Sequence, residues 1–495
     1  MGKKLISLLT LIILSITVTY AASIHQVARL RVPRNAKVFA SHTSSESGWD
    51  PTIWDNEQLE EMSNIHDVDV GEKEHDRITY NGHGLPGQPK PASFEQYAGY
   101  VKIDKSKGRH LFYYFAEADH LRDTKPLVLW FNGGPGCSSF GYGALQELGP
   151  FGVNPDGKTL FSRPYSWNKA ANMLFLESPT SVGFSYSNDT SDYDNLGDQN
   201  TARDTYKFLL KWLKRFPEYK NRDFYLVGES YAGIYIPQLA DLILHENYKA
   251  GKPIIKLKGI MMGNPDINDF TDQKGTYDYV WSHGLLSDET HKLIMKNCFE
   301  NSSNLNSSEC SDIKTKGDDE GGDIDPYAIY APLCRIPENA TLPVSPPTPK
   351  QGGYDPCVNK YALSYLNLPH VQKALHVKPT KWDLCSSYSK NWKDYTRTML
   401  QVYPRLINSK IKIHIYSGDT DSIVSVTSTR YSLAALNLKV VQPWQPWMDY
   451  KNKDVGGYKV VYEGLTFKTI RDAGHQVPQF QAGRAFFVFT EFLGH

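Results

Sequence analysis

A six-residue turn restricts the folds that are open to this chain. The sequence Gly228-Glu229-Ser230-Tyr231-Ala232-Gly233 follows an apolar run at 224–227 and precedes a helix-like run at 234–243. A serine between two glycines at a strand-to-helix turn is typical of a nucleophile elbow. Such a turn lifts the Ser230 hydroxyl out of the backbone at the start of a helix. Ser230 is therefore the candidate nucleophile, and an ordinary Gly-Ser-Gly turn is the alternative.

Further apolar runs predict a largely parallel sheet. A fully apolar strand is typical of a sheet that is buried on both faces, and the run 127–131 leads directly into a glycine-rich loop at 132–139. The spacing also predicts a helix over 200–216. The runs that predict strands are 96–103, 110–116, 127–131, 173–176, 224–227, 256–262, 410–416 and 466–470.

The middle of the chain differs in composition from its two flanks. Residues 266–393 hold five of the six cysteines, three of the four N-x-S/T sequons and a loose Pro/Thr-rich run at 336–353. Disulfides compensate for a small core in such a segment. We predict a disulfide-linked, largely helical cap inserted between two parts of one core, at 76–265 and 394–495.

The N-terminus predicts entry into the secretory pathway. Two lysines precede an apolar run at 5–18 and small residues, which indicates a signal peptide at 1–22 rather than a membrane anchor. Residues 23–75 are polar and aperiodic, and are interpreted as a pro-segment or mobile arm. We expect a secreted or vacuolar protein without a membrane segment in its mature form. Its expected glycosylation sites are Asn188, Asn301, Asn306 and Asn339.

Charge argues against a nucleic-acid partner. The formal net charge is +0 at pH 7, and no long basic run occurs. The glycine-rich loop also lacks the Gly-Lys-Ser/Thr ending of a phosphate-binding loop.

Two further residues complete a catalytic set in the expected order. A serine hydroxyl needs a base, and the base needs an orienting carboxylate. In α/β-hydrolases these follow in the order Ser, Asp, His, each after a strand. Asp421 follows the run 410–416, and His475 follows the last strand. Asp419 competes for the acid role, but we expect it to brace the turn.

An oxyanion site follows from the same pattern. It needs two backbone N–H donors. The residue after the nucleophile, Tyr231, would supply one, and Gly134 in the glycine-rich loop would supply the other.

Taken together, these motifs make the chain resemble the serine carboxypeptidases, especially those of plants. The resemblance extends from about residue 80 to the C-terminus. It is carried by the stretches 130–139, 147–150, 177–179, 182–186, 228–233, 418–424 and 473–475.

The resemblance implies how a substrate would be held. It assigns the C-terminal carboxylate of a peptide to Asn132, Gly133, Glu147 and Glu229. Two close carboxyls share a proton, and a protonated pair donates a hydrogen bond to an anion. Activity should therefore be highest at acid pH. Gln146 is the alternative to Glu147 if the loop differs by one residue.

The resemblance also implies three disulfides, namely Cys137–Cys385, Cys298–Cys310 and Cys334–Cys357. Some relatives are cut within the region that corresponds to 336–353. Relatives that prefer basic residues carry Glu after the catalytic histidine, whereas this chain has Gln476, so such a preference is not implied here.

We therefore predict an α/β-hydrolase fold with a mostly parallel central sheet and a serine carboxypeptidase activity. Its partners would be peptide or protein C-termini, no metal or organic cofactor would be needed, and a homodimer stays an open alternative. An acyltransferase or lyase on the same scaffold is one rival. Acyltransferase relatives tend to carry Asp before the nucleophile, where this chain has Glu229. A non-catalytic secreted binding protein is the other rival.

Overall fold

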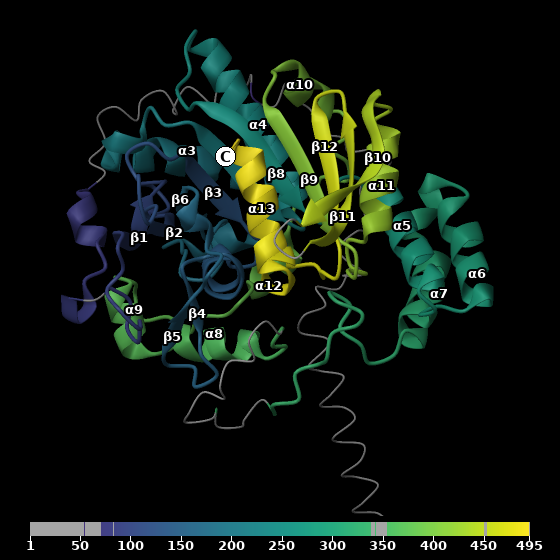
Figure 1. The fold of residues 1–495 in the computed structure, drawn as a ribbon, viewed down its shortest axis with the longest axis horizontal. Coiled ribbons are helices and arrows are strands. Elements are labelled where there is room, and N and C mark those ends of the chain that lie inside the picture. The colour runs from purple at the N-terminus through teal and green to yellow at the C-terminus, as the bar shows by residue number, and fades with distance from the viewer. Residues whose placement is uncertain are drawn as a thin grey trace, which may run out of the picture. The chain divides into compact units, whose positions relative to one another are not determined.

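A ten-stranded sheet forms the centre of the protein, in the strand order β1-β2-β6-β3-β7-β8-β9-β12-β11-β10 (Figure 1). The structure is a computed structural model, and it describes residues 54, 71–82, 84–337, 342, 354–449 and 453–494. The strands are β1 (Gln96–Lys102), β2 (His110–Ala116), β3 (Leu127–Phe131), β6 (Asn172–Leu176), β7 (Phe224–Glu229), β8 (Leu257–Gly263), β9 (Lys412–Gly418), β10 (Val440–Asp449), β11 (Asp454–Tyr462) and β12 (Leu465–Ile470).

The middle of the sheet is parallel. The strands from β6 to β12 pair in parallel, whereas β1, β2, β10 and β11 pair antiparallel at the two ends. The predicted α/β-hydrolase fold with a mostly parallel sheet is confirmed. The carboxyl ends of parallel strands meet at one edge of a sheet, so the loops after β3, β7, β8, β9 and β12 open on the same side.

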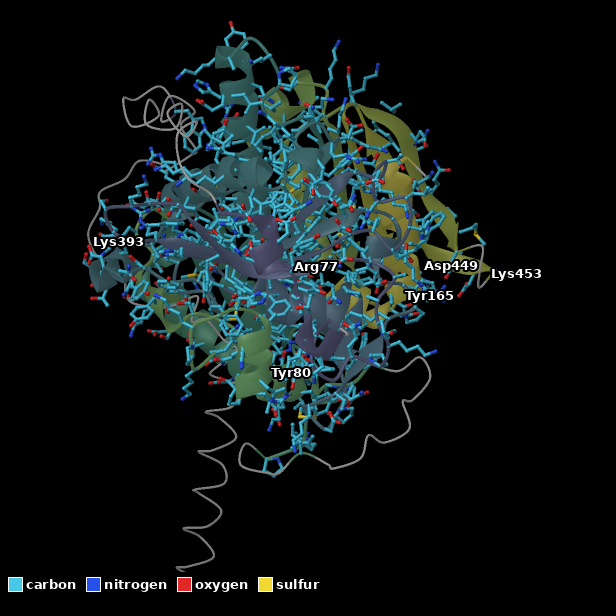
Figure 2. All side chains as sticks on the ribbon, turned by 90° about the vertical axis from the view of Figure 1, so that its left-hand side faces the viewer. Arg77, Tyr80, Tyr165, Lys393, Asp449 and Lys453 are labelled. Atoms are coloured by element: carbon cyan, nitrogen blue, oxygen red, sulfur yellow. A yellow bond between two sulfur atoms is a disulfide. The ribbon has the colours of Figure 1, made fainter. Side chains whose placement is uncertain are left out.

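Helices cover both faces of the sheet. The α-helices of the described residues, including those of the insertion, are α3 (Asp198–Arg215), α4 (Ala232–Lys249), α5 (Asp269–Ser282), α6 (Asp288–Phe299), α7 (Ser308–Glu320), α8 (Val358–Leu366), α9 (Pro369–Ala374), α10 (Tyr403–Asn408), α11 (Val426–Ala435), α12 (Val477–Phe480) and α13 (Ala482–Leu493). Side chains fill the space between these layers (Figure 2).

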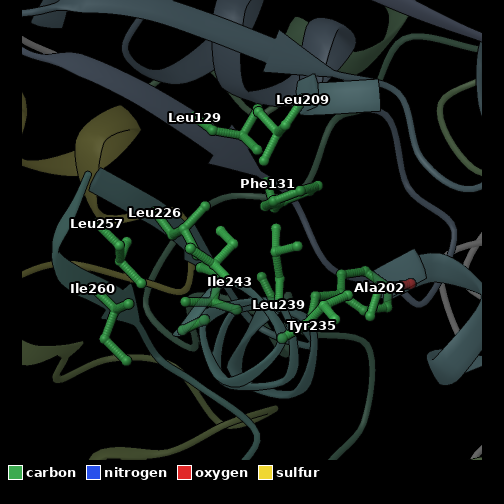
Figure 3. Packing of buried hydrophobic residues seen from close by; sticks show 14 of the residues in the cluster. Leu129, Phe131, Ala202, Leu209, Leu226, Tyr235, Leu239, Ile243, Leu257 and Ile260 are labelled. Atoms are coloured by element: carbon green, nitrogen blue, oxygen red, sulfur yellow. The ribbon is translucent and has the colours of Figure 1, made fainter. Parts of the chain in front are cut away.

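Alternate residues of β3 face two different hydrophobic cores. Leu129 and Phe131 join the cluster under α3 and α4, where Figure 3 shows them near Leu209 and Leu239. Val128 and Trp130 join the cluster on the opposite face. Because successive side chains of a strand point to opposite faces, a sheet covered on both sides needs a continuous apolar run, as 127–131 supplies.

The 266–393 insertion divides into two groups of helices. Helices α5, α6 and α7 lie together in Figure 1, and the α6–α7 pair has its own small core around Cys298 and Cys310. Helix α8 packs instead against the π-helix η6 (Ser139–Glu147) and the short strand β4 (Phe151–Val153), which pairs with β5 (Leu160–Ser162).

Two strands of the ten-stranded sheet, and the short β4–β5 pair outside it, are absent from the sequence prediction. Strands β10 and β11 extend the sheet beyond β12. Most of β10 is exposed, and it contains Pro443 and Pro446, which only an edge strand tolerates. An exposed strand without apolar alternation gives little sequence signal.

Within the segment 23–75, predicted as a pro-segment or mobile arm, the described residues are Trp54 and 71–75. Trp54, within the segment 23–75, is buried, and its indole Nε1 lies 3.4 Å from Asp241 Oδ2. The signal peptide 1–22, most of the segment 23–75, Asn339 and most of the run 336–353 lie outside the described residues. Within the described part of the chain, no helix has the length and apolar character to cross a bilayer.

Candidate active site

The elbow forms as a left-handed turn between β7 and α4. Ser230 has a φ of +64°, a conformation that side chains other than glycine rarely adopt. A Cβ at Gly228 would lie 2.3 Å from Phe131 O, and one at Gly233 would lie 2.2 Å from Asp266 O. Both glycines are therefore required by close backbone contacts. The second glycine stands three residues after the serine, and Ala232 takes the position that G-x-S-x-G gives to glycine.

Asp421 and His475 are directly hydrogen-bonded to each other. His475 Nδ1 lies 2.6 Å from Asp421 Oδ2, and both side chains are buried. A carboxylate at Nδ1 favours the tautomer that carries its proton there, which leaves Nε2 to accept one. Burial alone would lower the pKa of His475, but the charge of Asp421 and the hydrogen bond to it outweigh burial and raise that pKa.

The competing aspartate has a different role. Asp419 Oδ1 accepts a hydrogen bond of 2.8 Å from the backbone N–H of Asp472, which ties the turn after β9 to the loop after β12. Burial raises the pKa of Asp419 to about 6. Of the two candidates, only Asp421 contacts the imidazole.

Three residues that orient this pair were missed from the sequence. Asn264 Nδ2 donates to Asp421 Oδ2 at 2.9 Å, and Asn264 Oδ1 accepts from Gly418 N. The insertion contributes backbone contacts, because Tyr327 O accepts from His475 N at 2.7 Å and Pro326 O accepts from Ser422 N. The only sequence signal was the position of Asn264 directly after a predicted strand.

The glycine-rich loop lies against the elbow. A Cβ at Gly133 would lie 2.3 Å from Tyr231 N, so only glycine allows this approach. The backbone N–H groups of Gly134 and Tyr231 donate to no acceptor among the described residues. Two free N–H donors beside a serine can stabilise a developing oxyanion.

A buried cluster of one amide and two carboxyls adjoins Ser230. Asn132 Nδ2 donates to Glu147 Oε1 at 2.9 Å and to Glu229 Oε1 at 2.8 Å. Asn132 Oδ1 accepts from Trp130 Nε1 and Gly143 N, which fixes the orientation of the amide. The structure thus places Glu147, rather than Gln146, in this cluster.

The two carboxyls cannot both ionise cheaply. Burial raises the pKa of Glu147. Burial, the nearby charge of Glu147 and a hydrogen bond between the two groups raise the pKa of Glu229 well above its ordinary value. Oε2 of both residues is buried and accepts no hydrogen bond from an N–H or hydroxyl donor among the described residues. A pair that shares a proton can donate to an incoming anion, which two carboxylates would repel.

Another buried carboxyl, that of Glu177, is hydrogen-bonded to the glycine-rich loop. Glu177 accepts from Phe184 N at 2.6 Å, from Trp382 Nε1 and, in a short bond, from Ser138 Oγ. Burial raises the pKa of Glu177 to about 7. Its motif contributed to the resemblance, but its sequence context gave no role.

Three disulfides join the pairs that the resemblance implies, Cys137–Cys385, Cys298–Cys310 and Cys334–Cys357. Among the expected glycosylation sites, Asn188, Asn301 and Asn306 are exposed.

Comparisons with known proteins agree on one protein family. A family model described as serine carboxypeptidase matches residues 86–495. Among curated proteins of Arabidopsis thaliana, serine carboxypeptidase-like 26 is 48% identical over 434 residues, covering 85% of this chain and 93% of that protein. Serine carboxypeptidase 24 is 48% identical over 438 residues, covering 85% and 92%.

A solved structure supports the fold. Kex1Δp, a prohormone-processing carboxypeptidase from Saccharomyces cerevisiae, aligns with a TM-score of 0.71 at 24% identity, covering 85% of this chain and 97% of that one.

Proposed function

The chain belongs to the serine carboxypeptidase family, and we propose that it removes C-terminal residues from peptides through an acyl-enzyme. The observation that carries the proposal is the buried Asn132–Glu147–Glu229 cluster beside Ser230, because it can bind a carboxylate at the end of a chain.

Ser230 is the proposed nucleophile. Its Oγ forms a bond to the carbonyl carbon of the last peptide bond while its proton passes to His475 Nε2. The imidazolium that results is stabilised by Asp421, 2.6 Å from Nδ1. The N–H groups of Gly134 and Tyr231 would receive the oxyanion.

Collapse of the tetrahedral intermediate breaks the C–N bond. His475 returns its proton to the leaving nitrogen, and the free amino acid departs. Water then attacks the acyl-enzyme with His475 as base, which releases the shortened peptide and restores Ser230 Oγ–H.

Recognition of the chain end would depend on the shared proton. The Glu147–Glu229 pair and Asn132 would surround the substrate carboxylate, with Gly133 at the wall of the site. Because the pKa of both glutamates is raised, the pair holds its proton at acid pH and loses it as pH rises. The raised pKa of His475 acts in the opposite sense, because the base must be neutral, and so limits activity at the acid end.

Acyl transfer to another acceptor is the second candidate. The same acyl-enzyme would form, and an alcohol would replace water. Glu229 favours hydrolysis, because acyltransferase relatives tend to carry Asp before the nucleophile. A non-catalytic binding protein would not need the hydrogen-bonded Asp421–His475 pair or the free oxyanion donors.

We also propose that the protein travels through the secretory pathway to the vacuole or the cell exterior. The N-terminal apolar run, the disulfides and the exposed sequons at Asn188, Asn301 and Asn306 support this proposal.

A substitution at Ser230 tests the function. Purified protein would be incubated near pH 5 with N-blocked dipeptides, and release of the C-terminal amino acid would be measured for wild type and Ser230→Ala. We expect release by wild type and a loss of at least about 10³-fold in the variant. Absence of Ser230-dependent release would overturn the proposal. Transfer to an added alcohol without release to water would favour the acyltransferase.

A further inference from the structure

We propose that Asp198 is a positioning residue for the oxyanion site, because its carboxyl holds the Tyr231 side chain and thereby fixes the Tyr231 backbone N–H. This inference rests on the proposed function, in which that N–H receives the oxyanion. Asp198 touches neither the substrate nor the reacting atoms, and it would act only through Tyr231.

Asp198 is the first residue of α3 and is 0% exposed. Its Oδ1 accepts from the Tyr231 hydroxyl at 2.9 Å and from Trp392 Nε1 at 3.0 Å. Its Oδ2 accepts from the backbone N–H of Thr396 at 2.7 Å. A buried carboxyl with three donors is fixed in orientation, so its partner Tyr231 is fixed as well.

Aromatic rings enclose the Tyr231 side chain. The ring packs edge-to-face on Tyr235 and Trp392, with ring centroids 5.1 Å and 6.2 Å apart. It lies tilted against Tyr395, with a centroid distance of 5.5 Å. Tyr231 as a whole is 1% exposed. A hydroxyl bonded inside this cage is turned toward Asp198, so we infer that it affects chemistry through the position of its own backbone.

The segment 392–396, which supplies Trp392 and Thr396 to Asp198, also bonds the residues on either side of Asp198. Lys393, labelled in Figure 2, donates its backbone N–H to Leu196 O at 2.8 Å. Asp394 Oδ2 accepts from Gln199 N at 2.9 Å. One backbone–backbone bond and one bond to a side-chain carboxyl, on either side of Asp198, therefore join the start of α3 to residues 393 and 394.

The glycine-rich loop, which carries the second oxyanion donor Gly134, is held by Tyr235 in the first turn of α4. The Tyr235 hydroxyl accepts from Gly136 N at 3.2 Å, within the glycine-rich loop that carries Gly134. Tyr231 and Tyr235 are four residues apart and so lie on one face of the helix start. Together they fix the two donor segments relative to α4.

The Tyr231 contact persists when Asp198 takes up a proton. Burial first, and then the charge of Asp394, raise the pKa of Asp198 to about 7, so the group is protonated at acid pH. Trp392 Nε1 and Thr396 N can only donate, whereas a tyrosine hydroxyl can also accept. Tyr235 from α4 also lies close enough to feel the charge of this carboxyl, and Arg203 from α3 interacts with Asp394.

The substitution Tyr231→Phe removes the bond and keeps the ring. A displacement of about 1 Å at a reacting centre costs up to about 10²-fold in rate. We expect kcat of Tyr231→Phe to fall about tenfold, with KM within about twofold of wild type and with the same factor for substrates that differ in the side chain before the cut. Asp198→Ala, which removes the carboxyl in either protonation state, should lower kcat similarly, and the double variant should be no slower than the slower single variant.

Tyr113→Phe is the matched control. The Tyr113 hydroxyl donates to Asp76 Oδ2 at 2.6 Å, a buried Tyr–Asp bond on strand β2 away from the elbow. We expect this variant to keep wild-type kcat. Wild-type kcat in Tyr231→Phe, a change confined to KM, or additive losses in the double variant would each overturn the positioning role. Absence of Ser230-dependent activity in wild type would overturn the proposed function, and this inference with it.

Discussion

Two aspartates on one turn differ in one contact, because Asp421 hydrogen-bonds His475 and Asp419 does not; we therefore propose a catalytic role for Asp421 only. Asp421 accepts from Asn264 Nδ2, Ile423 N and Val424 N, and lies 2.6 Å from His475 Nδ1. Asp419 instead accepts from Asp472 N. The first carboxyl is held on the imidazole by three other donors, and the second joins two loops.

This difference gives opposite expectations for two conservative substitutions. Asp421→Asn should lower kcat by about 10³–10⁴-fold, because an amide favours the wrong imidazole tautomer. Asp419→Asn should lower kcat less than about tenfold, since it weakens a turn. Steady-state kinetics on one blocked dipeptide would compare them. A larger loss for Asp419→Asn would contradict the assignment.

Sequence could identify the residues that we propose react, but not those that hold them. Ser230, Asp421 and His475 follow strands in a recognisable order. Glu147 and Gln146 stayed ambiguous until the π-helix η6 placed Glu147 beside Asn132. Asn264, Glu177 and Asp198 are buried polar residues whose partners come from distant parts of the chain, and no local pattern marks such contacts.

Among the larger elements, the glycine-rich loop is joined to the end of the insertion. Cys137 is bonded to Cys385, 248 residues later in the chain. Beside it, Ser138 N donates to Leu384 O and Ser386 N donates to Gly136 O, both at 2.8 Å. The disulfide and these backbone bonds hold the loop that carries Gly133 and Gly134.

Removal of this disulfide should affect both stability and catalysis. We expect Cys137→Ser/Cys385→Ser to lower the free energy of unfolding by about 2–5 kcal/mol and also to reduce kcat, because the oxyanion loop loses its anchor. Urea denaturation and kinetics would measure the two effects.

The disulfide Cys298–Cys310 supplies the matched control. It closes a separation of 12 residues within the α6–α7 pair, away from the loop. Cys298→Ser/Cys310→Ser should be destabilised less, because a shorter loop has less entropy to lose, and should keep kcat. Equal losses of kcat in both double variants would contradict a specific role for Cys137–Cys385.

Elements with strong periodicity could be predicted, and exposed ones could not. The runs 127–131 and 466–470, both predicted as strands, correspond to β3 and β12. Strands β10 and β11 were not predicted, because they are held by pairing onto β12 and have no apolar pattern of their own. The division of the insertion into α5–α7 and α8–α9 likewise depends on packing against α11 and η6.

For the molecule as a whole, parallel strand ends gather residues that are far apart in sequence. Asn132 follows β3, Glu229 ends β7, Asp421 follows β9 and His475 follows β12. The same edge therefore holds a base that must be neutral and a carboxyl pair that must be protonated. The pH dependence of the enzyme should reflect both requirements.

We propose that the Glu147–Glu229 pair recognises a free chain end through its shared proton. The direct measurement is the ratio of kcat/KM for an N-blocked dipeptide with a free C-terminal carboxylate to that for its C-terminal amide, from pH 4.5 to 8. The His475 requirement applies to both substrates and cancels in the ratio. Glu229→Gln, which donates hydrogen bonds without titrating, would be measured in parallel.

We expect the wild-type ratio to be high at acid pH and to fall as pH rises through the raised pKa of the pair. In Glu229→Gln the ratio should fall less steeply, because its amide keeps a donor at every pH. A wild-type ratio that does not change with pH, or a Glu229→Gln profile identical to that of wild type, would contradict the account.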